Sequence, residues 1–523
     1  MMWAIFGDPC DENVIRSGTA TSGCEKYRGR WVLAATILAS SMAFIDGTVV
    51  NVALPALQTN LNATAIDVQW VIESYSLFLS ALLLVGGSLG DHYGRRRIFL
   101  IGVTIFALAS ASCGLAADIR QLILARGIQG IGAALLVPGS LAIISNSFSE
   151  QERGRAIGTW SGFSAITTGA GPVMGGWLIE HVSWRAVFFI NVPLALAVIA
   201  ISMRHVRESS DDKDRKVDWI GASLVGLGLG ALVYGLIESS RLGFGNRSVV
   251  IDLIAAGILL TAFLLFEART SHPMLPLSLF RSRTFSGTNL LTFLLYAALG
   301  GTLFFLPMNL IQVQHYSATA AGAALLPFIL LMFLLSRWSG GLVSRYGARL
   351  PLIVGPLIVA AGYALFTPSG IGNNYWTDFF PPVALLGLGM AISVAPLTTV
   401  VMSSVSQTHA GVASGINNAI ARTAGLVVIA FFGITMLHVF KDQLGQRVTD
   451  FPIGVAQSIE KQSNRLAAIQ IPAGQDPNTQ QSLRGVVDES FVSGFRAVMA
   501  GGALLAVAGA LTTFLFVRVQ RRR

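Results

Sequence analysis

Residues 86–102 read GGSLGDHYGRRRIFLIG, and residues 339–355 read SGGLVSRYGARLPLIVG. Each stretch is a short basic turn between two apolar runs, and the two align without gaps. A repeat of this kind predicts a chain built from two similar halves in which the turns occupy equivalent places. Chance similarity between short Gly- and Arg-rich turns is the alternative. The identical pairs are Gly87 and Gly340, Leu89 and Leu342, Tyr93 and Tyr346, Gly94 and Gly347, Arg96 and Arg349, and Gly102 and Gly355.

The apolar runs around these turns have the length of membrane spans, which need about 20 mostly apolar residues. The 523-residue chain is 53% hydrophobic and 12% charged, whereas soluble domains carry about 25% charged residues. We therefore expect an all-α membrane protein with fourteen transmembrane helices. The expected spans are 31–56, 67–90, 98–117, 121–146, 156–179, 185–204, 218–238, 250–268, 286–310, 319–343, 351–368, 378–402, 411–437 and 491–517.

The positions of the two turns predict the domain organisation. The first turn joins spans two and three, and the second joins spans ten and eleven, so each half has six helices if spans seven and eight are an insertion. The predicted segments are a disordered tail (1–30), an N-terminal six-helix bundle (31–204), a linker (205–217), an inserted helix pair (218–268), a C-terminal six-helix bundle (286–517) that includes a long outer loop (438–490), and a basic tail (518–523).

The basic residues predict the orientation in the membrane. Arginine and lysine are concentrated in alternate loops, and the positive-inside rule places such loops in the cytoplasm. This indicates a multi-pass protein of the cell membrane with both termini in the cytoplasm. It also accounts for the net charge of +9 without a nucleic-acid partner. The outer segment 438–490 is expected to be a flexible loop. Ile453, Ile459, Leu466 and Ile469 leave room for a short amphipathic helix, which prolines would interrupt. A cap over the exit or a docking site for a periplasmic or cell-wall partner are the alternatives.

Three of the ionisable residues inside expected spans, where charge is costly and usually functional, are the candidates for proton coupling. Asp46 is deep in the first span and is the preferred proton carrier. Glu73 is the second choice, because it could instead lie at a wet outer mouth. Arg126 could pair with a carboxylate, or extend to the membrane interface. The chain shows no catalytic motif, no metal-ligand spacing and no sign of a cofactor.

Several motifs resemble those of the major facilitator superfamily, and more narrowly its fourteen-helix drug:proton antiporter branch, over roughly residues 31–440 and the last helix. The turn after the second span resembles the superfamily signature, with His92 where Arg is usual. The resemblance implies that this turn is a cytoplasmic latch between the two bundles. Its residues are Gly87, Asp91, Gly94, Arg95 and Arg96.

Two further motifs resemble those of exporters in this family. The fourth span carries LILARGIQGIGAA (122–134), where the family places an arginine, here Arg126, near the proton path. The fifth span resembles the antiporter motif, which implies outward transport; a plain helix-packing face is the alternative. The antiporter-motif residues are Gly158, Gly171, Pro172, Gly175 and Gly176, with Thr167 in place of one usual glycine.

The segments IDGTVVNVALP (45–55) and AGVASGINN (410–418) also resemble this branch. Together with polar and aromatic side chains on core spans, they suggest a substrate cavity. The candidate residues are Asn51, Tyr75, Gln129, Phe304, Asn417, Asn418 and Arg422.

The resemblance implies a secondary transporter that exports a small amphipathic or hydrophobic compound in exchange for protons. The expected partners are that compound, protons and the lipid bilayer, and the expected state is a monomer. A dedicated metabolite exporter and a proton-coupled uptake symporter are alternatives on the same fold. A membrane receptor or scaffold without transport, and a membrane enzyme, are rivals of other classes.

Overall fold

The computed structural model describes residues 21–517 except 149, 211–217, 272, 373, 406–409 and 473–474. Within these ranges the chain is helical and contains no strand, which confirms the all-α class. The predicted tail 518–523 and most of the linker 205–217 lie outside the described residues.

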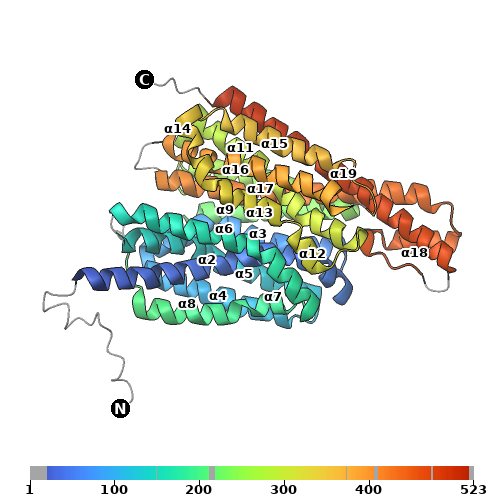
Figure 1. Ribbon diagram of the computed structural model, residues 1–523, viewed down its shortest axis with the longest axis horizontal. Helices are drawn as coiled ribbons and strands as arrows, with labels where there is room; N and C mark the ends of the chain where they lie inside the picture. Colours follow the sequence, from blue (N-terminus) through green and yellow to red (C-terminus); the bar gives the residue numbers. More distant parts are fainter. Residues whose placement is uncertain are drawn as a thin grey trace, which may run out of the picture.

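The first half of the chain supplies seven helices that pack together (Figure 1). An inserted pair, α9 and α10, follows them. The helices are α2 (Thr21–Asn60), α3 (Ala65–Tyr93), α4 (Arg95–Leu115), α5 (Ile119–Ser147), α6 (Glu150–His181), α7 (Ala186–Phe189), α8 (Asn191–His205), α9 (Trp219–Leu242) and α10 (Arg247–Glu267).

The second half supplies more interrupted helices, several of them broken by short 3-10 or π-helical turns. The elements are η1 (Leu277–Arg281), α11 (Arg283–Met308), η2 (Asn309–Val313), α12 (Ala318–Ala323), α13 (Leu326–Gly340), α14 (Leu342–Tyr346), α15 (Pro351–Phe366), η3 (Tyr375–Phe379), α16 (Phe380–Ser403), α17 (Ala410–Val448), α18 (Ile453–Lys461), η5 (Ser463–Ala468) and α19 (Pro477–Phe516).

Every one of the fourteen expected spans falls on helical structure. In the described part of the chain, twelve helices or helix pairs are long and apolar enough to cross a membrane, α15 is a shorter apolar helix, and α6 is outside that set. Polar caps define several helix starts, because a side-chain oxygen can accept from the free backbone N–H groups there. Thr64 and Asp67 form a reciprocal capping box at α3, and Asp118 caps α5.

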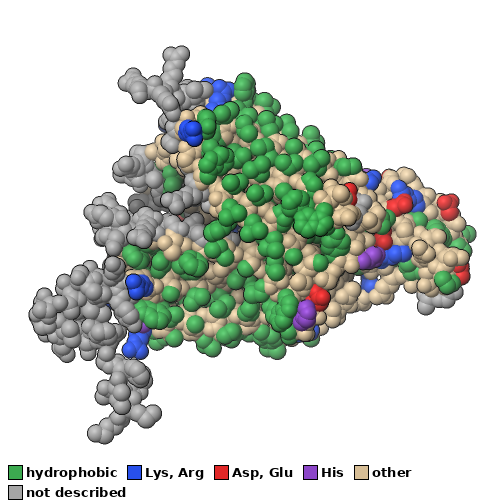
Figure 2. All heavy atoms as spheres, viewed as in Figure 1, with side chains coloured by type: hydrophobic (Ala, Val, Ile, Leu, Met, Phe, Trp, Pro, Cys, Tyr) green, Lys and Arg blue, Asp and Glu red, His purple; other side chains and the backbone are tan. Residues whose placement is uncertain are grey.

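The molecule has two distinct ends, which are clear in Figure 1. We call the end that holds the start of α2 and the end of α19 the terminal side. The opposite end, which holds α18, is called the loop side. The apolar surface between them forms a broad belt, while charged side chains gather towards the two ends (Figure 2). Such a belt is what a bilayer requires of the surface it surrounds.

The outer segment 438–490 is not the flexible loop that was expected. α17 continues to Val448 and α19 begins at Pro477, so only residues 449–476 connect them, and this connection contains α18 and η5. The helix α18 buries Val455 and Ile459, apolar side chains four residues apart on one helix face. That burial is the physical reason for the order of the segment.

The first helix also begins earlier than expected. Residues 21–30 belong to α2 rather than to a disordered tail, and residues 1–20 lie outside the described residues. Arg28 anchors this extension by donating from Nε to the carbonyl oxygen of His205 at 2.8 Å.

The inserted pair packs beside both halves. α9 contacts α3 of the first half and α17 of the second. Trp70 and Tyr234 are in ring contact at 5.8 Å between centroids. α10 packs mainly on α9 and is mostly exposed on its outer face, with Ile254 and Ile258 at 58% and 64% exposure. The pair is therefore a peripheral element that touches the core through α9 alone.

The two repeated turns share an unusual backbone geometry. Gly94 has φ 106° and ψ 124°, and its aligned partner Gly347 has φ 76° and ψ 168°. These conformations are accessible almost only to glycine. The repeat therefore extends from residue identity to backbone conformation at equivalent helix ends.

Replacing either glycine by alanine is expected to lower stability by different amounts. Gly347→Ala meets no atom within 4 Å, so we expect only the conformational cost, about 1–3 kcal/mol. At Gly94 the new Cβ would also lie 2.7 Å from Glu208 Oε1, which itself accepts from Arg96 N. Thermal unfolding in detergent should show a larger loss for Gly94→Ala; equal losses would contradict the role given to Glu208.

Candidate functional site

A buried ion pair lies at the centre of the first half. Arg126 on α5 donates from Nη1 to Asp46 Oδ2 on α2. The side chains are 1% and 0% exposed, so neither reaches the membrane interface, and extension of Arg126 to that interface is excluded. A buried charge is tolerated only when it is paired and hydrogen-bonded. The pair therefore requires the further partners described next.

Amides and a carbonyl complete the hydrogen bonding of this pair. Arg126 donates from Nε to the Val71 carbonyl at 3.1 Å and from Nη1 to Gln129 Oε1 at 2.7 Å. Gln129 donates to Asp46 Oδ1 at 2.8 Å, and Asn191 on α8 donates to the same oxygen at 3.3 Å. The helices α2, α3, α5 and α8 thus meet at one polar cluster.

Aromatic rings cover the guanidinium of Arg126. Its Cζ lies 4.2 Å from the ring centroid of Tyr75 and 5.9 Å from that of Phe188. A cation over an aromatic face is attracted to the ring, more so when both are desolvated. The arginine therefore has a fixed position even if its carboxylate partner changes.

Glu73 is a second buried carboxyl, and the wet outer mouth considered for it is excluded. It is 0% exposed, and neither carboxyl oxygen has a hydrogen-bond partner among the described residues. One turn away on α3, Gln69 donates to the Ile429 carbonyl of α17 at 3.0 Å. On the other side, Leu77 lies beside Gly230 of α9. Glu73 therefore faces the junction of α3, α9 and α17.

A cavity of about 240 Å³ separates the halves beside the ion pair. Both halves contribute its walls, through α2, α3 and α5 on one side and α11 and α17 on the other. Arg126 reaches it directly, so the polar cluster and the cavity share a side chain. The polar and charged lining residues are Asn51, Tyr75, Ser76, Ser80, Arg126, Tyr296 and Arg422.

This cavity opens towards the terminal side. Along one face of α17, Ile429 is 7% exposed, Arg422 is half-buried and Asn418 is exposed. Along α2, Leu54 is 0% exposed and Asn51 9%, while Gly47 is exposed. Among these residues exposure rises in the same direction on α2 and α17, away from the loop side, whereas Leu79 and Ser80 of α3 stay buried.

The loop side is closed by contacts between the halves. Gln312 of η2 donates to Gln58 Oε1 of α2 at 2.6 Å, and Thr319 of α12 donates to Glu180 Oε2 of α6 at 2.6 Å. The hydroxyl and backbone N–H donations from Thr319 lower the pKa of Glu180. This contact therefore persists to more acidic pH than an ordinary glutamate contact would.

The glycines of the expected antiporter motif allow a close approach between helices. A Cβ at Gly171 or Gly175 would lie 2.2 Å from Thr48 Oγ1 or 2.1 Å from Val49 Cγ2 of α2. A Cβ at Gly176 would lie 2.3 Å from the Ala318 carbonyl of α12. α6 is therefore packed against both halves through small residues, as packing in membranes favours. Pro172 is buried on the same helix, and the surroundings of Gly158 lie outside the described side chains.

The structure brings only part of the expected substrate site to the cavity. Asn51, Tyr75 and Arg422 line it, whereas Gln129 is used by the ion pair. Phe304 is 2% exposed and stacks edge-on with Phe305 in the core. Asn417 donates to Asn289 and Thr292 of α11, and Asn418 is exposed and is not among the lining residues. The spacing of residues along a helix could not tell which of these candidates face the cavity.

Comparison with known proteins agrees with this architecture. The chain matches the Major Facilitator Superfamily over residues 36–430. The chain belongs to that superfamily. Multidrug resistance protein Stp of Mycobacterium tuberculosis (strain CDC 1551 / Oshkosh) is 34% identical over 486 residues, covering 91% of this chain and 90% of Stp.

A second relative and a solved structure extend the comparison. The Tetracenomycin C resistance and export protein of Streptomyces glaucescens is 34% identical over 514 residues, covering 95% of this chain and 94% of that protein. A bacterial homologue of the human lysosomal transporter Spinster has a TM-score of 0.64 at 19% identity, covering 93% of this chain and 96% of the other. The likeness to the solved structure of the Spinster homologue supports the fold alone. Membership of a transporter superfamily excludes the membrane-enzyme alternative.

The described contacts of Arg96 in the turn between α3 and α4 lie within the first half, and the latch that the superfamily resemblance implied stays a prediction. Arg96 donates from Nη1 to the Val206 carbonyl, and its backbone N–H donates to Glu208. The backbone N–H of Arg95 donates to the Ser209 carbonyl at 2.8 Å. These partners lie just after α8 in the same half, which fits a major facilitator fold that is open on this side. Gly87 packs near Pro138 of α5, and the side chain of Asp91 lies outside the described side chains.

Sequence reasoning missed two members of the polar cluster. Asn191 bonds to Asp46 and also donates to Ser110 Oγ at 3.0 Å. Ser110 in turn donates to the Phe188 carbonyl at 2.8 Å. An asparagine within an otherwise apolar run was the available signal, because an amide is costly in a span unless it finds a partner.

Removing one member of the ion pair should be more destabilising than removing both. Asp46→Asn leaves a buried guanidinium without its counter-charge, which typically costs about 3–5 kcal/mol. The double variant Asp46→Asn/Arg126→Gln removes both charges and should recover a large part of that loss. A double-mutant cycle by thermal unfolding measures the coupling. Additive losses would show that the pair contributes no interaction energy.

Proposed function

We propose that this chain exports small amphipathic or hydrophobic compounds, of the kind named for its relatives, in exchange for protons. The observation that carries the proposal is the buried Asp46–Arg126 pair, which borders a cavity formed by both halves. A carboxyl that is shielded from water and held by a cation can change partner when it takes up a proton. The family supplies the second requirement, which is two halves that alternate about a central site.

The orientation proposed is terminal side in the cytoplasm of a cell-membrane protein. Basic residues at this side support it, among them Arg95, Arg96, Arg204 and Arg349, since short cytoplasmic loops collect such residues. The cavity then opens to the cytoplasm, where an exporter takes up its substrate. We take the protein to act as a monomer.

The proposed cycle runs through Asp46. Protonation from the outside neutralises the carboxylate, so its attraction to Arg126 falls and the halves can change their packing. The rings of Tyr75 and Phe188 keep the guanidinium in place while its partner is neutral. One proton moving through 100 mV supplies about 2.3 kcal/mol, which corresponds to about fifty-fold accumulation of substrate before any pH gradient is counted.

Glu73 is the second candidate for proton transfer. It lacks a hydrogen-bond partner among the described residues, so it requires a proton or a cation to neutralise it in that position. It lies on α3 beside the residues that line the cavity, including Ile72 and Ser76. A cationic substrate could use the same carboxylate.

Proton coupling is tested in inverted vesicles with an acidic interior, with tetracenomycin C as the first substrate. An antiporter takes up the added compound and releases protons, so the pH gradient should fall. For Asp46→Asn we expect at least a tenfold slower proton release with substrate counterflow retained. Glu73→Gln, measured in the same way, tests the second candidate for proton transfer. If Asp46→Asn releases protons at the wild-type rate, Asp46 is not the coupling residue.

The same experiment separates export from the uptake symporter on this fold. A symporter driven by an acidic vesicle interior carries compound out of the vesicle together with protons. Accumulation of the compound inside the vesicles supports export, and loss from preloaded vesicles together with protons supports symport. No pH-dependent flux of any tested compound would contradict both.

A further inference from the structure

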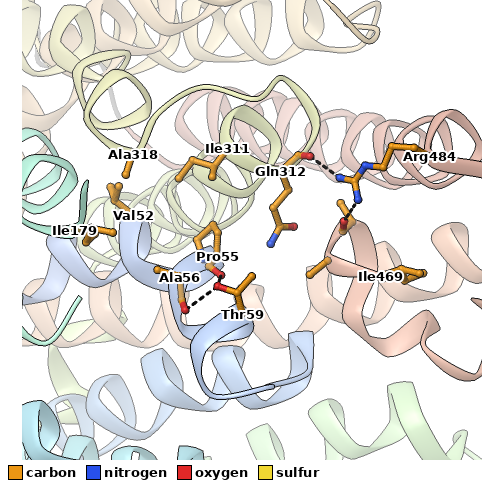
Figure 3. A pocket seen from close by; sticks show the side chains of 12 residues that line it. Val52, Pro55, Ala56, Thr59, Ile179, Ile311, Gln312, Ala318, Ile469 and Arg484 are labelled. Atoms are coloured by element: carbon orange, nitrogen blue, oxygen red, sulfur yellow. Dashed lines mark hydrogen bonds between the residues drawn. The ribbon is translucent and has the colours of Figure 1, made fainter. Parts of the chain in front are cut away.

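A second cavity, larger than the central one, lies at the loop side. It has a volume of about 410 Å³ and is lined by residues of α2, α6, η2, α12, η5 and α19 (Figure 3). Its walls are mainly apolar, with Val52, Ala56, Ile179 and Ile311 among them. We call it the loop-side chamber. Its size falls within the range of about 300–1,000 Å³ that small-molecule sites occupy.

The chamber is separate from the central cavity. Both use α2, but the central cavity uses Gly47, Val50 and Asn51, whereas the chamber uses Val52, Pro55, Ala56 and Thr59. At about 100° per residue, these sets lie on different faces of α2 and at successive turns. The remaining walls share no residue. A ligand in one cavity therefore does not occupy the other.

One polar group inside the chamber is unpaired. Gln312 is 9% exposed, and its Nε2 donates to Gln58 Oε1 at 2.6 Å. Its Oε1 has no hydrogen-bond partner among the described residues and almost no accessible surface, so a ligand reaches it when the amide turns towards the chamber. Figure 3 shows the amide extending from η2 into the space between α2 and Ile469. A buried acceptor without a partner costs about 1–3 kcal/mol, and a ligand that donates a hydrogen bond would remove this cost.

The roof of the chamber is made by the connection between α17 and α19. Ala467, Ala468 and Ile469 line the chamber from this side. Arg484 of α19 holds the roof by donating to the carbonyl oxygens of Ala467 at 2.9 Å and of Gln312 at 2.7 Å.

The roof is also tied to the first half. Gln58 donates to the Arg465 carbonyl at 3.4 Å, and Arg465 donates from Nη2 to Asn62 Oδ1 at 2.5 Å. The chamber thus exists only where the roof meets both halves.

We propose that the loop-side chamber is a second ligand site, which binds a drug-sized, largely apolar compound through a hydroxyl or amine that donates to Gln312 Oε1. The inference rests on the proposed export function, since it supplies the compound and gives the chamber a place on its outward route. The apolar walls provide the area to bury, and the free acceptor provides orientation. The two hydrogen bonds from Arg484 hold the roof in place. Movement of the roof would release the compound.

The test uses the full-length protein in detergent and tetracenomycin C, a fused-ring aromatic compound with hydroxyl groups. Ala468→Cys places a reporter thiol in the chamber, and Ala421→Cys places one in the central cavity. Alkylation by N-ethylmaleimide at each position is read by peptide mass spectrometry. We expect the compound to slow alkylation at both positions by at least fivefold. Gln457→Cys, exposed on α18, should show no change and controls for general closure.

Gln312→Leu tests recognition by the acceptor. It should raise the concentration that half-protects Ala468→Cys by about tenfold, as expected for one hydrogen bond, with little change at Ala421→Cys. Gln58→Leu breaks the same Gln58–Gln312 contact but keeps Oε1, so it should change the value less than twofold. Equal effects of the two variants would overturn the assignment of Gln312 as the recognition group.

The outcomes separate this inference from the proposed export. Protection at Ala421→Cys without protection at Ala468→Cys overturns the chamber as a ligand site and leaves export standing. If alkylation at Gln457→Cys slows as much as at Ala468→Cys, the compound closes the protein as a whole. This result also overturns the chamber as a ligand site. No protection at either cavity overturns the chamber site and contradicts export of this compound.

Discussion

The burial of a charged pair inside the first half is the constraint from which the rest of the site follows. Asp46 and Arg126 are removed from water, and such desolvation must be offset by hydrogen bonds and by well-aligned partners. This explains why Gln129 and Asn191 converge on the carboxylate from different helices. It also explains why four helices must keep their register, since a shift of one turn would leave a charge unpaired. The ion pair thus fixes the internal geometry of the half that moves as a unit.

The packing between the halves is of a different kind. On the loop side it depends on small residues and on single hydrogen bonds, such as those from Gln312 and Thr319. Each such bond contributes about 0.5–1.5 kcal/mol in net terms. Apolar side chains of both halves also share one buried cluster on this side, among them Val68 of α3 and Val428 of α17. The glycines of α6 contribute to this packing, because they bring backbones close without side chains that interlock.

The sequence predicted the fold well and the site only in part. Length and hydropathy placed all fourteen expected spans on helices, and twelve helices or helix pairs of the described residues are long and apolar enough to cross a membrane, because the bilayer imposes a simple requirement on each. The pairing of Asp46 with Arg126 could be anticipated, since a membrane leaves a buried charge few alternatives. The positions of Phe304 and Gln129 could not, because which face of a helix meets a cavity depends on the rotation set by tertiary packing. The order of residues 449–476 was not expected, because the apolar side chains of α18 gain their partners only in the tertiary packing against α17 and η5.

The uninterrupted helix α17 runs from the central cavity to the roof of the loop-side chamber. Arg422 and Ile429 line the central cavity on this helix, which continues to Val448, where the roof segment begins. α19 starts at Pro477 on the other side of the roof, carries Arg484, and packs along α11, which forms another wall of the central cavity. The roof is thus held at both ends by helices that also border or support the central cavity. A shift of α17 that widens that cavity must displace the start of the roof, because a continuous helix transmits displacement along its axis. α17 therefore connects a wall of the central cavity directly to the start of the roof.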